Sequence, residues 1–386
     1  MDYIFPKIEC IDDVLPAING CEEFRVIDKG DYKVVNYMVS FEKTWDITDG
    51  YAYIRRECRG MIFDKDGKLI SRPYHKFFNA NERPETNLNK INLYKPHVIL
   101  EKLDGSMVRP IPTERGFRLA TKAGVTEVSM NAEYFIADKP QYGKFIKNCL
   151  KNDTTPIFEW VSRKNRIVID YPEDNLILTA IRNNVDGTYF NYYNLIGITT
   201  FWNIPLVEAV EGLSIQNIHL LAEQIRKWDI DGEGIVIRFD DGHMVKIKTD
   251  DYVLRHKSKD QISLEKNVLE VILNDVVDDL IPLLCDEDVK RIQDFQIAFW
   301  NSVNKICLEL DKLYSTGNQL YPEKKDFAVN YVQQQVPKQY QSLMYTMKGG
   351  KTSKEALIEL IGRSIPSQPK IDENRWMWGN LSWYNT

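Results

Sequence analysis

The sequence lacks the cysteine and histidine patterns that usually mark a disulfide framework or a metal site. Its six cysteines are scattered, with no C-x-x-C pair and no flanking histidines at zinc spacing, so we expect reduced thiols in a reducing compartment. The five histidines include no H-E-x-x-H pair, and no G-x-S-x-G segment occurs. Zinc-dependent and serine-hydrolase chemistry are therefore unsupported.

Long apolar runs and an excess of positive charge are also missing. No stretch of about 18 apolar residues occurs, and the first residues lack the basic segment and apolar run of a secretory signal. We therefore expect a cytoplasmic protein with no membrane segment. The 50 basic side chains are outnumbered by 56 acidic ones, which gives a net charge of -6. This balance excludes a bulk polycation, so a nucleic-acid partner would be held by a local patch.

The chain is long enough for two or three domains, and its first 255 residues carry strand signals separated by turn residues. We expect strands over residues 33–41, 60–64, 98–102, 156–161, 176–182, 234–239 and 244–248. Two helices interrupt this pattern, one over about 131–150 and one that starts near Ser214 as its N-cap. The first part therefore predicts an α+β fold of antiparallel sheets with flanking helices.

Beyond residue 256 the pattern changes to long helical periodicity, over 263–284 and 286–313, and Thr352 with Glu355 resembles a capping box. This change predicts an all-α C-terminal domain over 256–386. The end of the chain carries large aromatic residues among polar ones, and we expect them to dock the tail onto this domain. These residues are Trp376, Trp378, Trp383 and Tyr384.

The most informative segment is Lys102-Leu103-Asp104-Gly105, because K-x-D-G presents a lysine that is to be covalently loaded with a nucleotide. A lysine amine is protonated at neutral pH and becomes nucleophilic only where burial or neighbouring cations favour its neutral form. We therefore expect cations and carboxylates around Lys102.

The chain offers several such cations. Arg59 precedes a glycine, and Lys76 precedes two aromatic residues that end at Phe78, a combination suited to phosphates and a nucleobase. Lys246 and Lys248 are two residues apart on a predicted strand, so they share one face and need anions, which a triphosphate supplies. Alone, such a pair is more typical of a solvated strand face, and Arg59 of a surface salt bridge.

Two carboxylates, Glu159 and Glu233, lie on or beside predicted strands with apolar neighbours. Carboxylates at the rim of a phosphate pocket commonly hold a hard divalent metal, which would offset charge that develops on the α-phosphate. Alone, Glu233 would be interpreted as a turn residue. The functional interpretation depends on all of these segments occurring together around K-x-D-G.

These segments, in this order, resemble the motifs of the covalent nucleotidyltransferases, and within them those of the bacteriophage RNA ligase 1 family. The resemblance covers about residues 30–255. It is carried by Glu57-Cys58-Arg59-Gly60, Lys76-Phe77-Phe78-Asn79, Lys102-Leu103-Asp104-Gly105-Ser106, Phe158-Glu159, Asn165-Arg166-Ile167-Val168, Glu233-Gly234 and Lys246-Ile247-Lys248 through Tyr252.

The resemblance implies a nucleotidyltransferase (adenylation) domain over 1–255 and a helical domain over 256–386 for RNA or tRNA recognition. It implies ATP-dependent RNA ligation, in which Lys102 attacks the α-phosphate of ATP and becomes lysyl-AMP. The AMP then passes to a 5′-phosphorylated RNA end, and a 3′-hydroxyl displaces it. The implied cofactor is Mg²⁺ or Mn²⁺, and the implied substrate is RNA with these ends, such as a broken tRNA anticodon loop under repair. We expect a monomer, in the host cytoplasm if the chain is phage-encoded.

The resemblance also implies roles for individual residues. Lys102 is the nucleophile, Glu159 and Glu233 serve the metal and the nucleotide, and residues 176–182 form the strand that lines the adenine pocket. Val125 occupies a position where the family has a polar residue, so the contacts expected around Lys122 stay open. The residues expected to bind ATP are Arg59, Lys76, Phe78, Lys122, Glu159, Lys246, Lys248 and Tyr252.

Other functions stay open at this point. A DNA ligase or a capping-type guanylyltransferase would share K-x-D-G, but these normally continue into a strand-rich OB-fold, whereas the second half here is helical. A non-catalytic RNA-binding protein of the same fold is the second alternative. In the helical domain, residues 324–354 hold six lysines against Asp326, which predicts either a solvated helix face or a phosphate-contact patch for RNA.

Overall fold

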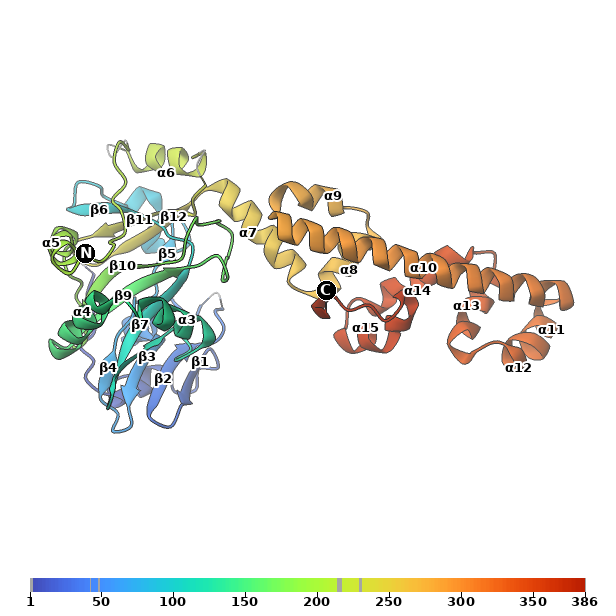
Figure 1. Cartoon of the computed structure of the whole chain (residues 1–386), viewed down its shortest axis with the longest axis horizontal. Coiled ribbons are helices and arrows are strands. Elements are labelled where there is room, and N and C mark those ends of the chain that lie inside the picture. Colours follow the sequence, from blue (N-terminus) through green and yellow to red (C-terminus); the bar gives the residue numbers. More distant parts are fainter. Residues whose placement is uncertain (1–2, 42, 48, 214–216, 229–230, 386) are drawn as a thin grey trace. The chain divides into compact units, whose positions relative to one another are not determined.

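The computed structural model describes residues 3–41, 43–47, 49–213, 217–228 and 231–385, and it divides into two compact units, Met1–Val253 and Leu254–Thr386. The first unit contains antiparallel sheets with flanking helices, and the second is helical (Figure 1). The α+β class expected from the sequence, with an all-α second part, is confirmed. Within the described residues, no helix is long and apolar enough to cross a membrane.

The first sheet of the first unit has the strand order β1-β2-β3-β4, with every pair antiparallel. The buried residues Val35 of β2 and Met61 and Phe63 of β3 join one core cluster. The short helices α1 and α2 precede β1 and β3 in the sequence. These elements are β1 (Phe24–Asp28), β2 (Tyr32–Tyr37), β3 (Arg59–Asp64), β4 (Leu69–Ser71), α1 (Leu15–Ile18) and α2 (Ala52–Glu57).

The second sheet has the order β10-β9-β7-β8, again antiparallel throughout. Helices α3, α4 and α5 pack on it through a core that contains Phe145, Phe158 and Leu195 (Figure 1). The elements are β7 (Ser106–Thr113), β8 (Gly116–Ala120), β9 (Thr154–Val161), β10 (Asn175–Asn183), α3 (Glu127–Ile136), α4 (Pro140–Lys151) and α5 (Tyr192–Trp202).

The third sheet has the order β5-β12-β11-β6, in which only the short β5 runs parallel to its neighbour among the described strands. One face packs against helix α6, with Leu221 and Ile225 contacting a cluster that includes Ile235 and Ile247. Because strand side chains alternate, the opposite face receives Lys246 and its neighbours. The elements are β5 (Phe78–Asn79), β6 (His97–Glu101), β11 (Gly234–Phe239), β12 (Met244–Lys248) and α6 (Ile218–Arg226).

All seven strands expected from the sequence are present, but two helix predictions for the first unit need correction. The single helix expected over 131–150 is wrong, because Pro140 cannot donate to the carbonyl four residues before it and instead starts a second helix at its first position. Ser214 lies outside the described residues. The N-cap of α6 is Asn217, whose side chain accepts from the His219 and Leu220 amides.

The second unit is built around the long helix α10 (Asp286–Leu320), which extends beyond the predicted end at residue 313. The continuous helix expected over 263–284 is wrong, because Asp275 adopts a positive φ of 56° between two shorter helices. The other helices are α7 (Asp250–Ile262, across the division), α8 (Glu265–Leu273), α9 (Val277–Leu280), α11 (Lys324–Asp326), α12 (Gln333–Gln335), α13 (Lys338–Lys348), α14 (Ser353–Ser364) and α15 (Gln368–Asn374).

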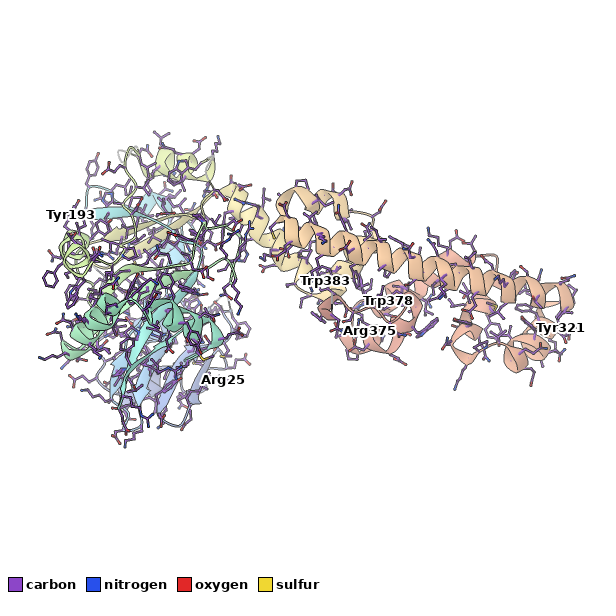
Figure 2. The ribbon with its side chains drawn as sticks, viewed as in Figure 1. Arg25, Tyr193, Tyr321, Arg375, Trp378 and Trp383 are labelled. Atoms are coloured by element: carbon purple, nitrogen blue, oxygen red, sulfur yellow. The ribbon has the colours of Figure 1, made fainter. Side chains whose placement is uncertain are left out.

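The aromatic tail docks onto the second unit (Figure 2). Trp378 and Trp383 are fully buried in its core, and the Trp383 indole donates to the Ile262 carbonyl at 2.8 Å. Arg375 pairs with the buried Glu265, whose carboxylate also accepts from the Trp383 amide at 2.9 Å. The expected docking of the tail is therefore confirmed.

Several lysines of the 324–354 segment have partners within the second unit. Lys348 donates to the Pro322 carbonyl at 2.8 Å, and Lys351 pairs with Glu359 at 2.5 Å. The Lys354 ammonium lies 5.1 Å from the centre of the Trp300 ring. Much of this positive charge therefore helps to hold the unit together, which weakens the interpretation of the segment as a free phosphate-contact patch.

Candidate active site

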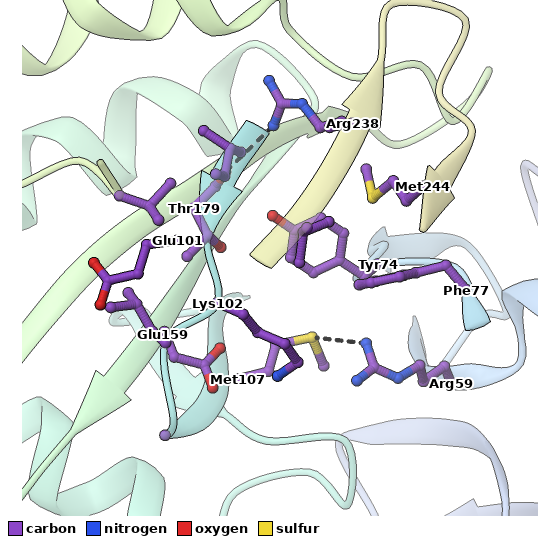
Figure 3. A pocket seen from close by; sticks show the side chains of 15 residues that line it. Arg59, Tyr74, Phe77, Glu101, Lys102, Met107, Glu159, Thr179, Arg238 and Met244 are labelled. Atoms are coloured by element: carbon purple, nitrogen blue, oxygen red, sulfur yellow. Dashed lines mark hydrogen bonds between the residues drawn. The ribbon is translucent and has the colours of Figure 1, made fainter. Parts of the chain in front are cut away.

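A pocket with a volume of about 220 Å³ lies on the face of the third sheet opposite α6, and residues of the second sheet close its other side (Figure 3). It combines charged side chains with apolar and aromatic ones, as expected for a site that binds a charged aromatic ligand. The charged lining residues are Arg59, Glu101, Lys102, Glu159 and Arg238, and the apolar or aromatic ones include Tyr74, Phe77, Met107, Val236 and Met244.

Lys102 is held at this pocket by the end of β6. Its backbone amide donates to the Gly234 carbonyl at 2.9 Å, which continues the pairing of β6 with β11. Its ammonium nitrogen lies 2.5 Å from Oε2 of Glu233. The lysine side chain remains 21% exposed whereas that of Glu233 is 5% exposed, so a buried carboxylate fixes a lysine that a ligand can still reach.

Glu233 is an ion-pair partner here. Its second oxygen accepts from the Lys248 ammonium at 2.9 Å, so each carboxylate oxygen is bound to one ammonium group. The sequence predicts a metal ligand at Glu233, and this stays a prediction; in this structure both carboxylate oxygens pair with ammonium groups. Lys248 in turn lies 4.8 Å from the centre of the Tyr252 ring.

The carboxylate of Glu159, by contrast, has no hydrogen bond or ion pair to any described residue. Glu159 lies on β9 opposite Met107 and is half-buried. Burial raises the pKa of its carboxyl to about 7; the nearby Lys102 opposes this rise, and the negative charge of Glu233 adds to it. An unpaired carboxylate that faces a pocket is a suitable ligand for a divalent cation.

The described residues contain no group of three or more histidine, cysteine or acidic side chains that could form a complete metal cage. A metal at Glu159 would therefore take its other ligands from water or from a bound phosphate, which is the usual coordination of Mg²⁺.

Lys246 points to the pocket side of β12 without a carboxylate partner among the described residues. The pKa of its ammonium is lowered to about 7, first by burial and then by the neighbouring cations Lys76, Arg59 and Lys102. The Lys246 nitrogen lies 5.2 Å from the centre of the Phe77 ring. Cations gathered without matching anions form a site that an anionic ligand would stabilise.

Lys76 and Lys122 meet at a residue that the sequence reasoning missed. Each ammonium lies 5.2 Å from the centre of the Tyr37 ring. Burial tends to raise the pKa of the Tyr37 phenol, but Lys76, Arg59 and Lys122 together lower it. Tyr37 lies on a predicted strand outside every recognised motif, and only the pairing of β2 with β3, next to Arg59, reveals its position.

At Gly60 and at Gly105, two backbone segments of the site come so close that a side chain would not fit. Gly60 has a φ of 94°, and a Cβ atom there would lie 2.6 Å from the Lys122 carbonyl oxygen, so only glycine lets the Lys122 turn reach β3. A Cβ atom at Gly105 would lie 2.5 Å from the Trp160 carbonyl oxygen. This second approach brings the K-x-D-G turn against the strand that carries Glu159.

Two of the predicted ligand-binding residues occupy different places. Phe78 is 2% exposed and packs beneath Arg56 and Lys76 rather than lining the pocket; its neighbour Phe77 lines the pocket instead. Tyr252 is also 2% exposed, and its hydroxyl donates to Oδ1 of Asp104 at 2.7 Å. The sequence does not show which of Phe77 and Phe78 faces the pocket, because β5 is only two residues long. It does not show the bond between Tyr252 and Asp104 because the two residues are far apart in the chain.

Asp104 is the centre of a hydrogen-bond network beneath the nucleophile candidate. Its Oδ2 atom accepts from the backbone amides of Val168 and Ile169 at 2.7 and 2.8 Å. Its own amide donates to the Tyr171 hydroxyl at 2.8 Å. Together with Tyr252, these bonds fix the turn that follows Lys102.

A buried ionic network lies just before Arg59 in the chain. Glu57, two residues before it, is 1% exposed and accepts from both terminal nitrogens of Arg182 at 2.7 Å. Arg72 also pairs with Glu57 at 3.1 Å. The glutamate of the E-C-R-G segment is thus a scaffold residue, and Arg59 is the residue that reaches the pocket.

Comparisons with known proteins point to RNA ligases. A family model described as RNA ligase matches residues 57–261. RNA ligase 1 of bacteriophage TS2126 is 25% identical over 92% of this chain and 90% of its own length. A candidate RNA ligase of Thermovibrio ammonificans is 34% identical over 46% of each chain, so this chain spans less than half of that relative. Among solved structures, an archaeal ATP-dependent RNA ligase is 14% identical over 65% of this chain and 64% of its own, with a TM-score of 0.44.

Proposed function

Because the chain belongs to the RNA ligase family typified by RNA ligase 1 of bacteriophages, we propose that it is an ATP-dependent RNA ligase. It joins a 5′-phosphate end of RNA to a 3′-hydroxyl end through a lysyl-AMP intermediate. Unit Met1–Val253 is the adenylation domain, and unit Leu254–Thr386 contributes to RNA recognition.

The observation that supports this most strongly is the pairing of Lys102 with Glu233 at 2.5 Å beside a pocket surrounded by cations. The pocket is large enough for a planar base, and Tyr74 and Phe77 offer it aromatic faces. Lys246 and Lys76, which have no carboxylate partner among the described residues, would hold the phosphates of the same nucleotide.

In the first step, the Lys102 amine forms a bond to the α-phosphorus, and the bond from that phosphorus to the bridging β-phosphate oxygen breaks. Pyrophosphate leaves with the bonding electrons. Glu233 is hydrogen-bonded to the ammonium and is positioned to take the proton that the amine loses. Lys246 and Lys248 hold the phosphates, and Arg59 with Lys122 stabilises the charge that grows on the departing pyrophosphate.

A bound Mg²⁺ or Mn²⁺ would offset negative charge on the α-phosphate. Glu159 fits such an ion, because its carboxylate has no partner among the described residues and burial raises its pKa. Glu233 does not fit while it pairs with Lys102 and Lys248. Tyr252 acts through Asp104 as a positioning residue.

In the second step, a 5′-phosphate oxygen of RNA attacks the same phosphorus, and the bond to Lys102 breaks. In the third, a 3′-hydroxyl attacks the 5′-phosphate and AMP leaves. We propose a broken tRNA anticodon loop as a physiological substrate, with RNA repair as the role, and a monomer that acts in the cytoplasm.

Incubation with labelled ATP and Mg²⁺, followed by a chase with 5′-phosphorylated RNA, tests this function. We expect a labelled protein band without RNA, its loss on adding RNA, and a sealed product. Labelling from GTP alone would indicate a guanylyltransferase. Absence of label from both nucleotides would remove the proposal in favour of a non-catalytic RNA-binding protein.

A further inference from the structure

A second pocket, with a volume of about 320 Å³, lies at the turn between β11 and β12 and shares no lining residue with the candidate active site. Aromatic rings form much of its wall, namely Tyr3, Tyr53, Phe239 and His243. The Tyr3 and His243 rings are nearly parallel, at 7°, with their centres 6.5 Å apart. His243 also stacks on Phe239, with the ring centres 5.6 Å apart, so this wall is a packed aromatic surface on which a flat ligand would stack.

The β11–β12 hairpin separates the two pockets. Arg238 and Met244 line the active-site pocket, whereas their chain neighbours Phe239 and His243 line the second pocket. Because successive side chains of a strand point to opposite faces, the two pockets lie on opposite sides of this hairpin. A ligand in the second pocket therefore cannot be the nucleotide held at Lys102.

Three residues that line the second pocket carry buried polar atoms with no hydrogen-bond partner among the described residues. These atoms are Nε of Arg56, the hydroxyl oxygen of Tyr3 and Nε2 of His243. Arg56 is 2% exposed, and its other contacts, to the Trp45 carbonyl and to Glu85, leave Nε unpaired. An unsatisfied buried donor or acceptor destabilises a protein, and a ligand that carries both donors and acceptors would remove this cost.

Basic side chains complete the wall. Lys90 is exposed, and Lys95 pairs with Asp241 at 3.1 Å while remaining 38% exposed. A nucleobase supplies a planar ring with donors and acceptors on its edge, and its attached phosphate would lie near these lysines. The combination favours a nucleotide within a strand over a purely apolar ligand.

Phe78 lies near both a cation of the second pocket and a cation of the candidate active site. The Phe78 ring centre lies 5.6 Å from the Lys76 ammonium, which faces the active site, and 5.0 Å from the Arg56 guanidinium, which lines the second pocket. The two cations therefore lie near each other around the buried Phe78 ring, which places the second pocket within a few nucleotides of Lys76.

We propose that the second pocket binds one nucleobase of the substrate RNA, a few nucleotides from the end that reacts at Lys102. This inference rests on the proposed ligase function and adds a specific contact to it. The pocket fixes the path of the strand and contributes to binding through stacking on Tyr3 and His243 and through bonds to Arg56.

The test is an abasic scan. A fluorescent 5′-phosphorylated RNA is prepared as a series in which one nucleotide at a time lacks its base, and affinity is measured by anisotropy without ATP, so that no turnover occurs. With the unmodified protein, we expect one position at which loss of the base weakens binding about tenfold, the size of one base-stacking contact.

The matched variants are Ile47→Trp, which fills the pocket from a lining residue that is 49% exposed, and Val26→Trp, which places the same bulk at an exposed residue of β1 outside it. Ile47→Trp should bind intact RNA about tenfold more weakly and lose the sensitive position, whereas Val26→Trp should behave as the unmodified protein. If Ile47→Trp does not fold, His243→Ala serves in its place.

Adenylation of the protein by ATP without RNA distinguishes failure of the second-pocket proposal from failure of the ligase function. Normal adenylation with no sensitive position, or a sensitive position that persists in Ile47→Trp and His243→Ala, would overturn the second pocket and leave the ligase function intact. Absence of adenylation in the unmodified protein would instead remove the ligase function itself.

Discussion

The buried network of Glu57, Arg72 and Arg182 gives the sharpest stability prediction for this chain, and the perturbation is Glu57→Gln. Glutamine keeps the size of the side chain but leaves two guanidinium groups, both 0% exposed, without a carboxylate. The remaining protons of Arg72 and Arg182 already bond backbone carbonyls, such as those of Asn184 and Gly187. No described group is placed to replace the lost negative charge.

The magnitude follows from the pKa of Glu57. Burial alone would raise that pKa, but Arg182 and Arg72 lower it from 4.5 to about 2. At about 1.36 kcal/mol per pH unit, this fall corresponds to about 3 kcal/mol of stability at neutral pH. Breaking a buried ion pair by removing one partner costs about 3–5 kcal/mol in other proteins, which is consistent.

The sign of the pH dependence is also fixed. Because the folded-state pKa lies below the unfolded value, the carboxylate contributes its full stability above about pH 4.5 and loses it as the pH falls towards 2. The difference between the unmodified protein and Glu57→Gln should therefore be largest at neutral pH and shrink below pH 4.5.

Hydrogen exchange of peptides from β3 and β10, measured in the intact chain, is the appropriate assay because it separates the first unit from the helical one. Protection should fall about a hundredfold in Glu57→Gln. Glu223→Gln, which removes one partner of the exposed pair with Lys227, should leave protection unchanged. An equal, small effect of both substitutions would refute the assignment of Glu57 as a buried scaffold residue of the first unit.

Three further predictions concern the site. Tyr252→Phe removes the bond to Asp104 and should slow lysyl-AMP formation by about tenfold or more, with an unchanged far-UV spectrum; an unchanged rate would deny Tyr252 a positioning role. Since the pKa of Lys246 in the free protein is about 7, affinity for a non-hydrolysable ATP analogue should weaken from pH 7 to 9. Lys246→Arg should make this affinity independent of pH. An affinity that does not change with pH in the unmodified protein would exclude Lys246 as the titrating phosphate contact. Because the pKa of Glu159 is about 7, Mn²⁺ affinity, measured by electron paramagnetic resonance, should decrease as the pH is lowered below 7. Glu159→Gln should bind Mn²⁺ weakly at every pH. Equal Mn²⁺ binding by both proteins would exclude Glu159 as a ligand.

The chemistry-bearing residues could be found from the sequence because they lie on local patterns. Alternating apolar residues identified β11 and β12, and their two-residue spacing was enough to place Lys246 and Lys248 on one face of a strand. The same reasoning failed where a contact between residues far apart in the chain determines the position of a side chain. Tyr252 meets Asp104 across 148 residues, and nothing in either local segment indicates that bond.

Burial and competition for partners explain the other differences. The roles of Phe77 and Phe78 depend on which face of the two-residue strand β5 meets the core. Glu233 resembles a metal ligand in the sequence, but two ammonium groups occupy its carboxylate in the fold. The single helix over 131–150 fails for a local reason, because Pro140 starts a new helix rather than continuing the first.

The most direct test of the central claim is to locate the nucleotide on the protein. The chain is incubated with ATP and Mg²⁺ without RNA, digested at neutral or alkaline pH, and analysed by mass spectrometry, with Lys102→Ala and the exposed Lys65→Ala as a matched pair. We predict AMP on Lys102 in the unmodified protein and in Lys65→Ala, and none in Lys102→Ala. AMP on another lysine, or undiminished labelling of Lys102→Ala, would contradict the assignment of Lys102 as the nucleophile.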